Sequence, residues 1–177
     1  SRGLGDVYKR QLCRLHGRTL TNTVSATLSS QEEVGERGMT CVMNNVKPDV
    51  VICFEGCPAD DSFEEEYMIQ SALKKGPMLR HFDRSMITSP RFQRFALELA
   101  HANDIPVQES VRKGGGTNGG ITHTAQFGIP TIVIGVPVRY AHSSYGILAY
   151  QDYEPVSYTH LRAHETKLHL VCRLLLE

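Results

Sequence analysis

The apolar run at residues 130–136 constrains the fold of this chain more than any other segment. It runs from Pro130 to Val136, and between them it carries Thr, three β-branched apolar residues and one Gly. A strand with one wet face alternates apolar and polar side chains, so an uninterrupted apolar run is typical of a strand covered on both faces. The chain is therefore expected to build a sheet with helices on either side.

The neighbouring segments alternate between strand and helix patterns. Strands are expected near 22–29, 49–55, 78–82 and 106–111, and helices near 35–45 and 119–127. A further helix should begin at Pro90 behind the N-cap Ser89 and end by Asn103, with an apolar stripe that includes Phe92 and Leu99. This alternation predicts an α/β fold, a layered sheet with helices on both faces.

Both ends of the chain resemble translated sequencing adapters. Residues 1–11 and 156–166 match the two strands of such an adapter, and 170–177 resembles the flow-cell sequence beyond it. Such segments are set aside in fold reasoning. We expect three parts: an adapter-like tail at 1–11, a partial domain at 12–155 that is an internal piece of a longer gene, and a second tail at 156–177. The tails should lack a defined place in the fold, except that 168–175 is apolar enough to form a helix.

The charge and cysteine content of residues 12–155 exclude several classes of protein. There are 13 basic and 16 acidic residues, so no basic stripe is left for nucleic acid, and no apolar run approaches the length of a membrane span. The four cysteines in this range are too few for a secreted disulfide scaffold, which favours a cytoplasmic protein. Cys53 and Cys57 could bind zinc, but a structural zinc site needs a second closely spaced pair of ligands.

Acidic residues and one histidine follow the expected strands. Glu32 and Glu33 come after the first strand, Glu55 ends the second, and His142 follows the apolar run. Open α/β sheets bind ligands at such strand ends. Carboxylates and histidine are ligands of hydrolytic zinc, cobalt or manganese sites, and an adjacent free carboxylate can act as a general base. Taken alone, each is more often an ordinary residue: paired glutamates are usually solvated, and a lone histidine is usually structural.

Several longer motifs resemble one family, the two-metal aminopeptidases that include glutamyl aminopeptidases and tetrahedral (TET) aminopeptidases, also called endoglucanase M or cellulase M. The resemblance covers essentially all of 12–155, the C-terminal part of the catalytic domain. It rests on the segments 31–38, 48–55, 76–77, 83–86, 114–118 and 139–143.

The resemblance implies a role for each candidate residue. Glu32 would be the general base, Glu33 and Glu55 would each bind one metal, and His142 would complete a site. Two divalent ions, zinc, cobalt or manganese, would activate water for hydrolysis of N-terminal residues from peptides. The substrate pocket would include Gly115, Gly116, Thr117, Asn118 and Arg139. The parent protein would be cytoplasmic and a homo-oligomer such as a dodecamer, with peptides as substrates and no nucleic-acid or membrane partner.

The chain also departs from the family pattern. Glu55 stands where Asp is common, and Asn118 stands where many members have Asp. The family's first-site histidine, the bridging aspartate and the inserted β-rich domain lie upstream of the matched region, so we expect this chain to be inactive. Two alternatives stay open: a metal- or sugar-binding protein of the same fold that is not a peptidase, and phosphate binding by the glycine loop at 114–120.

Overall fold

The computed structural model describes residues 22–163 and 172–176 of the chain. The strands are β1 (Ala26–Leu28), β2 (Val50–Pro58), β3 (Met78–Phe82), β4 (Gln108–Val111), β5 (Thr131–Arg139), β6 (Ile147–Leu148) and β7 (Cys172–Leu176). The helices are α2 (Arg37–Asn45), α3 (Pro90–His101), α4 (Asn118–Thr124) and α5 (Tyr150–Ala163), with short 3-10 helices η1 (Glu32–Val34) and η2 (Glu66–Met68).

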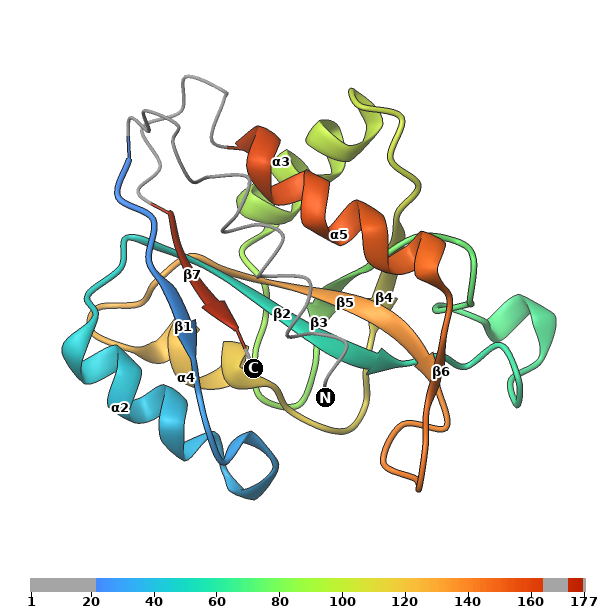
Figure 1. The fold of residues 1–177 in the computed structure, drawn as a ribbon, viewed down its shortest axis with the longest axis horizontal. Helices are drawn as coiled ribbons and strands as arrows, with labels where there is room; N and C mark the ends of the chain where they lie inside the picture. The colour runs from blue at the N-terminus through green and yellow to red at the C-terminus, as the bar shows by residue number, and fades with distance from the viewer. Residues whose placement is uncertain (1–21, 164–171, 177) are drawn as a thin grey trace.

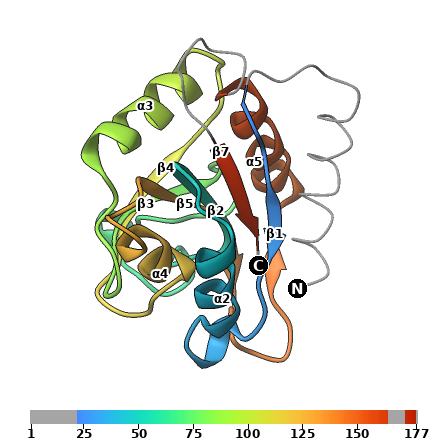
Figure 2. The same cartoon turned by 90° about the vertical axis from the view of Figure 1, so that its left-hand side faces the viewer.

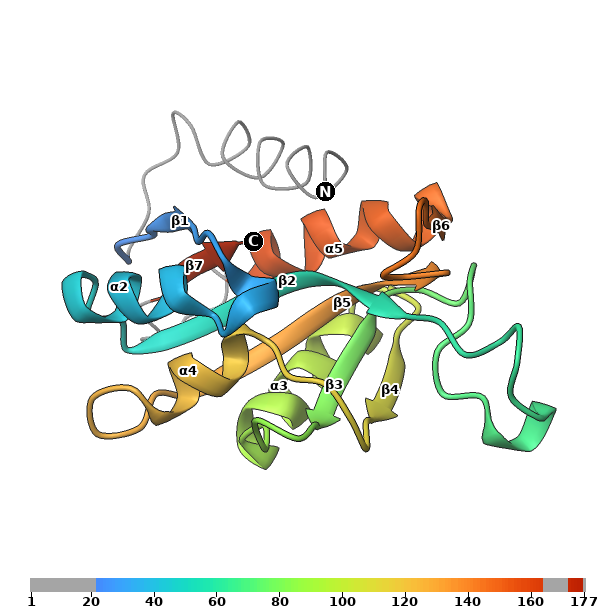
Figure 3. The same ribbon diagram turned by 90° about the horizontal axis from the view of Figure 1, so that it is seen from below.

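The described strands form one mixed sheet in the order β1-β7-β2-β5-β3-β4, and β6 pairs with β5. Strands β2 and β5 are parallel neighbours in the centre, and Figure 3 shows them running side by side through the molecule. Strand β3 is antiparallel to β5. Because β1, β7, β2 and β5 run parallel to one another, the carboxyl ends of β1, β2 and β5 lie at the same edge of the sheet.

Apolar side chains cover both faces of the sheet. One core joins Ile52, Ile132 and Ile134 of the sheet to α3 and α5. The other core joins Val51 and Val133 to α2 and α4. Figures 1 and 2 show these two pairs of helices on opposite sides of the sheet. The α/β fold with helices on both faces, predicted from the apolar run, is therefore confirmed.

The strands and helices expected within residues 22–136 are present, with small shifts at their ends. The strand expected at 22–29 is only three residues long, and the helix expected at 35–45 begins at Arg37. The helix predicted to begin at Pro90 does so. The structure adds η1, η2 and β6, which carry too few residues for a recognisable pattern.

The C-terminal elements cross the boundary expected at residue 156. Helix α5 continues to Ala163, and β7 lies between β1 and β2, parallel to both. The expected helix at 168–175 lies partly outside the described residues; where the structure describes it, from Cys172, the chain is a strand, so that prediction is wrong there. A five-residue segment that is apolar apart from Arg173 can complete a sheet because its backbone groups pair with the strands on either side. None of the described helices has the length and apolar character that crossing a membrane would require.

Candidate functional site

Glu32 and Glu33 lie in η1, on a short turn between β1 and α2. The backbone is left-handed at Gln31 (φ 59°) and Glu36 (φ 46°), a conformation that costs non-glycine residues energy and persists only where the surrounding structure holds it. Gly38 pins this turn to α2, since its N–H donates to the Ser30 carbonyl at 2.9 Å and a Cβ there would lie 2.4 Å from the Ser30 backbone. The close packing at Gly38 therefore fixes the position of both glutamates.

Glu55 lies in β2, beside the central strand β5. Its side chain is buried, with 6% of the residue exposed. In the register of the sheet it stands opposite Gly135. The Arg80 side chain of β3 forms an ion pair with it, with 3.2 Å between Arg80 Nη2 and Glu55 Oε1.

His142 follows β5 in the loop that leads to β6. The backbone is left-handed at both Tyr140 (φ 59°) and His142 (φ 61°). The loop brings the imidazole to η1, where Nε2 of His142 lies 3.2 Å from Oε1 of Glu33. Both side chains of this pair are largely exposed. Two residues 109 positions apart in sequence thus meet where the strand ends meet.

These side chains line one pocket of about 350 Å³, which we call the acidic pocket. Its lining includes the predicted residues Glu32, Glu33, Glu55, His142, Gly115 and Gly116. Four glutamates take part, because Glu36 joins the three predicted ones, against the two arginines Arg80 and Arg112. This surplus of carboxylates beside the glycine loop favours a cation over a phosphate.

The other three residues predicted for the substrate pocket do not line the acidic pocket. Thr117 is buried and caps α4, where its hydroxyl accepts a hydrogen bond from the Gly119 N–H at 3.1 Å. Asn118 is buried and its amide donates to the Ser29 hydroxyl at 3.0 Å. Arg139 donates to both carboxylate oxygens of Asp61, at 2.8 and 2.9 Å. In the described structure these three side chains hold the fold around the pocket.

Glu32 has the perturbed acidity expected of a general base. Partial burial raises the pKa of its carboxyl above the usual value of 4.5, and the nearby charges of Glu33 and Glu36 raise it further. His142 and Arg80 oppose the shift with smaller effects. A carboxylate with a raised pKa binds a proton more strongly and is therefore a stronger base. The shift also moves its pKa toward the working pH, where a general base is most effective.

The donor atoms in the acidic pocket are of the types that bind divalent cations, but they do not complete a coordination shell. Carboxylate oxygen and imidazole nitrogen are ligands of hydrolytic metals, and Glu33 and His142 already lie side by side. Glu55 is instead paired with Arg80. Within the part of the chain that the structure describes, no three His, Cys, Asp or Glu side chains are grouped so that they could hold a metal ion.

Sequence reasoning missed Arg80, Arg112 and Glu36 as lining residues. Arg80 carried a usable signal, since it is a charged residue inside the otherwise apolar start of a strand, three residues before Asp83. A buried charge of this kind needs partners, and here they are Asp83, just after the same strand, and Glu55 on another strand. Arg112 donates to Asp60 and to the Pro58 carbonyl, contacts that depend on loop positions no local pattern predicts.

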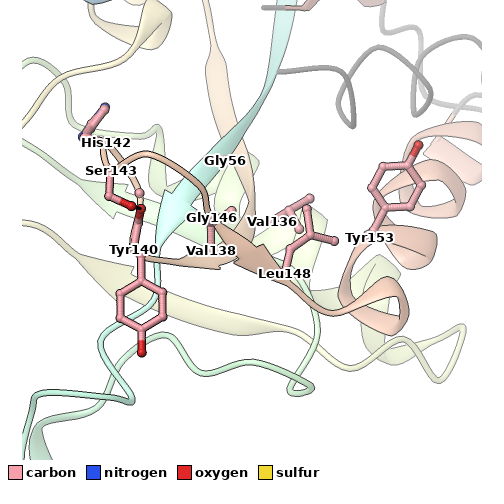
Figure 4. A pocket seen from close by; sticks show the side chains of 10 residues that line it. Gly56, Val136, Val138, Tyr140, His142, Ser143, Gly146, Leu148 and Tyr153 are labelled. Carbon is pink, nitrogen blue, oxygen red and sulfur yellow. Dashed lines mark hydrogen bonds between the residues drawn. The ribbon is translucent and has the colours of Figure 1, made fainter.

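A second pocket, of about 280 Å³, adjoins the acidic one, and we call it the apolar pocket. Figure 4 shows Val136, Val138 and Leu148 between the His142 loop and Tyr153 of α5. The two pockets share Gly56 and His142 in their linings. An acidic and an apolar compartment thus meet along one wall.

Comparison with known proteins identifies a family. The family model of the M42 glutamyl aminopeptidases matches residues 7–158. The glutamyl aminopeptidase of Lactococcus lactis subsp. cremoris is 36% identical over 138 residues, which are 78% of this chain and 38% of that protein. The lysyl aminopeptidase of Pyrococcus furiosus is 30% identical over 116 residues, 65% of this chain and 32% of that protein. The chain thus spans less than half the length of these relatives.

Solved structures show the same fold. A TET aminopeptidase from a marine sediment thaumarchaeon superposes with a TM-score of 0.82 and 32% identity, covering 93% of this chain and 46% of that one. The TET1 peptidase of Pyrococcus horikoshii, which can assemble into a tetrahedron or a large octahedral shell, superposes with a TM-score of 0.62 and 27% identity, covering 77% of this chain and 38% of that one.

Proposed function

The chain belongs to the M42 glutamyl aminopeptidase family, and from this premise we propose that it is part of a metal-dependent aminopeptidase that removes N-terminal residues from peptides. The observation that carries the proposal is the acidic pocket, where three predicted carboxylates and His142 come together from three separate segments. The relatives named above as aminopeptidases support the same reaction class.

Each residue of the acidic pocket takes a role that its surroundings support. Glu33 and His142, which are 3.2 Å apart, would hold one divalent ion, with Glu55 as the donor for a second. When bound, zinc, cobalt or manganese would supply Lewis acidity at the scissile carbonyl. Glu32 accepts a proton from the attacking water and passes it to the leaving amine, a task that suits its raised pKa.

The substrate contacts are proposed on similar grounds. Gly115 and Gly116 bring backbone to the pocket wall. Thr117, Asn118 and Arg139 would act by keeping this wall in place, since their side chains bond to protein groups. We also propose that the parent protein is cytoplasmic, from its few cysteines. By analogy with the tetrahedron and octahedral shell named for the Pyrococcus horikoshii TET1 peptidase and with the dodecamer of a second solved TET1 structure, we propose that it forms homo-oligomers such as dodecamers.

The chain on its own is proposed to be inactive. A catalytic zinc site normally has about three protein ligands and an open position. In the described structure only two such ligands, Glu33 and His142, lie side by side, and Glu55 forms an ion pair with Arg80. Isothermal titration with zinc and with cobalt, together with an aminoacyl-nitroanilide assay, tests this. Two tightly bound equivalents, or turnover that Glu32→Gln abolishes, would contradict it.

The division of roles is tested by substitution. Glu33→Gln should weaken cobalt binding by this chain, whereas Glu32→Gln should leave it nearly unchanged. Glu36→Gln is a matched control, because Glu36 lines the same pocket without an assigned role. In the complete reading frame, Glu32→Gln should lower kcat by about 100-fold, the scale of a lost general base. If Glu32→Gln removed the metal and Glu33→Gln retained it, the two roles would be reversed.

A further inference from the structure

Arg80 is a buried cation near the centre of the sheet. Only 4% of the residue is exposed. Its guanidinium lies between two buried carboxylates, with Nη2 3.2 Å from Glu55 Oε1 and Nη1 3.0 Å from Asp83 Oδ2. Removing a charged side chain from water costs several kcal/mol unless it is well paired. Both carboxylates therefore matter to the placement of the guanidinium.

Asp83 anchors one side of the guanidinium firmly. Its Oδ1 accepts hydrogen bonds from the Ser85 N–H at 2.7 Å, the Ser85 hydroxyl at 2.8 Å and the Met86 N–H at 2.9 Å. Its Oδ2 is thereby fixed toward Arg80 Nη1. Because the guanidinium is planar and rigid, fixing one nitrogen also directs the other nitrogen, and that one faces Glu55.

The pair between Arg80 and Glu55 reaches across β5. Glu55 on β2 is opposite Gly135 of β5, and Arg80 on β3 is opposite Val133 of the same strand. Residues directly opposite each other in a sheet share a face, so Arg80 and Glu55 lie on one face of β5. Gly135 has no side chain there, and a Cβ would lie 2.7 Å from the Cys57 side chain. The Cys57 and Met78 side chains fill the space over Gly135, so only a residue without a Cβ fits at this crossing.

We propose that Arg80 is a positioning residue that holds the Glu55 carboxylate in an ion pair and competes with a divalent cation for it. The inference rests on the proposed role of Glu55 as a metal ligand. Its physical basis is that one carboxylate charge is already balanced and that a bound divalent ion would be repelled by the neighbouring guanidinium. Glu33 differs, since its described partner is the exposed side chain of His142. The two candidate ligands are therefore unequal, with Glu33 available and Glu55 held back.

Cobalt titration of the whole chain tests the proposal. Arg80→Met keeps an unbranched side chain of similar length and removes the charge, so the cobalt affinity should rise by about 10-fold, a modest share of the repulsion between charges at this distance. The rise should disappear in Arg80→Met/Glu55→Gln, because the carboxylate that was released is gone. Arg112→Met is the matched control: Arg112 lines the same pocket but pairs with Asp60, at 2.9 Å, and its removal should change the affinity much less.

A second variant covers the case in which Arg80→Met does not fold, since it leaves Glu55 and Asp83 buried without their cation. Glu55→Asp keeps every charge and shortens the arm by one methylene, which weakens the pair with Arg80 and should also raise the cobalt affinity. Circular dichroism confirms that each variant is folded. Unchanged affinity in the folded variants, or a rise that survives Glu55→Gln, would overturn the proposal.

The failure of this inference can be told apart from failure of the proposed function. If the native chain binds cobalt, Glu33→Gln weakens that binding and neither Arg80→Met nor Glu55→Asp strengthens it, Arg80 does not compete and only the inference fails. If neither the native chain nor any variant binds cobalt, the metal assignment fails and the inference fails with it.

Discussion

Removing the Asp152 carboxylate should destabilise the chain severely. Asp152 lies in the first turn of α5 and is fully buried. Its Oδ2 accepts a hydrogen bond from the Lys74 N–H at 2.6 Å, and its Oδ1 accepts one from the Gly76 N–H at 2.8 Å. The backbone is left-handed at both Lys74 (φ 66°) and Gly76 (φ 92°), so the carboxylate holds a strained turn just before β3.

The expected loss follows from the two donors that would be left behind. A buried donor without a partner costs about 1–3 kcal/mol, which applies in full to the Gly76 N–H, whereas the part-buried Lys74 N–H can regain some contact with water. Asp152→Ala should therefore lower the free energy of unfolding by about 2–4 kcal/mol. That is a large part of the 5–15 kcal/mol typical of a domain. Asp152→Asn keeps one acceptor but turns an NH₂ group toward a backbone N–H, so it should lose at least half as much.

Urea denaturation followed by circular dichroism measures the change. Gln151→Ala is the matched control, because the Gln151 side chain donates to the carbonyl of the same Lys74 at 3.1 Å but is exposed. This substitution should lower the free energy of unfolding by no more than about 0.5 kcal/mol. If the free energies of unfolding of Asp152→Ala and of the native chain differed by less than about 1 kcal/mol, α5 would not be docked on this turn as the structure shows.

Three further predictions concern the site and its supports. Because the pKa of Glu32 is raised in the folded chain, the folded state holds this proton to higher pH than the unfolded state does. The free energy of unfolding should therefore fall as pH rises from 4.5 through the folded pKa. Thermal unfolding measured across this pH range should show the fall in the native chain and not in Glu32→Gln. Burial raises the pKa of Cys57 to about 12, whereas Cys41 is exposed, so a thiol reagent followed by peptide mass analysis should label Cys41 and leave Cys57 unmodified until denaturant is added. Gly38→Ala should lower the free energy of unfolding, measured by urea denaturation, by about 1–3 kcal/mol, because the added Cβ would overpack against the Ser30 backbone. Gly114→Ala is the control and should lower it less, since a Cβ there has no neighbour within 4 Å.

Local patterns predicted most of the fold. The uninterrupted apolar run became β5, flanked by β2 and β3 and covered on both faces. Helix α3 begins at Pro90 because the fixed φ of proline suits a first turn and needs no N–H partner there. The gathering of Glu32, Glu33, Glu55 and His142 was also indicated by the sequence, since three of them follow strands and Glu55 was expected to end one, although β2 continues to Pro58.

Contacts between distant residues were beyond prediction from local patterns. Arg80 stands out as a charge in an apolar strand, but its pairing with Glu55 depends on the strand order, which is a property of the whole sheet. The family resemblance placed Arg139 in the substrate pocket, and its contact with Asp61, 78 positions away, could not be foreseen from its neighbours in sequence. Strand β7 pairs with two strands that are distant in sequence, so its place depends on the gap that β1 and β2 leave.

The wall that the acidic and apolar pockets share makes two properties of the molecule inseparable. Gly56 and His142 belong to both linings, and a Cβ at Gly56 would come within 3.4 Å of Val138 in the apolar pocket. A substitution at either position therefore changes the acidic compartment and the apolar compartment at once. Changes at Leu148 or Tyr153 touch only the apolar side, and changes at Glu32 or Glu33 touch only the acidic side. Directed evolution that seeks a new ligand preference without disturbing the chemistry thus has freedom at the exposed Leu148, very little at Gly56 and His142, and little at Tyr153, which is buried in the core.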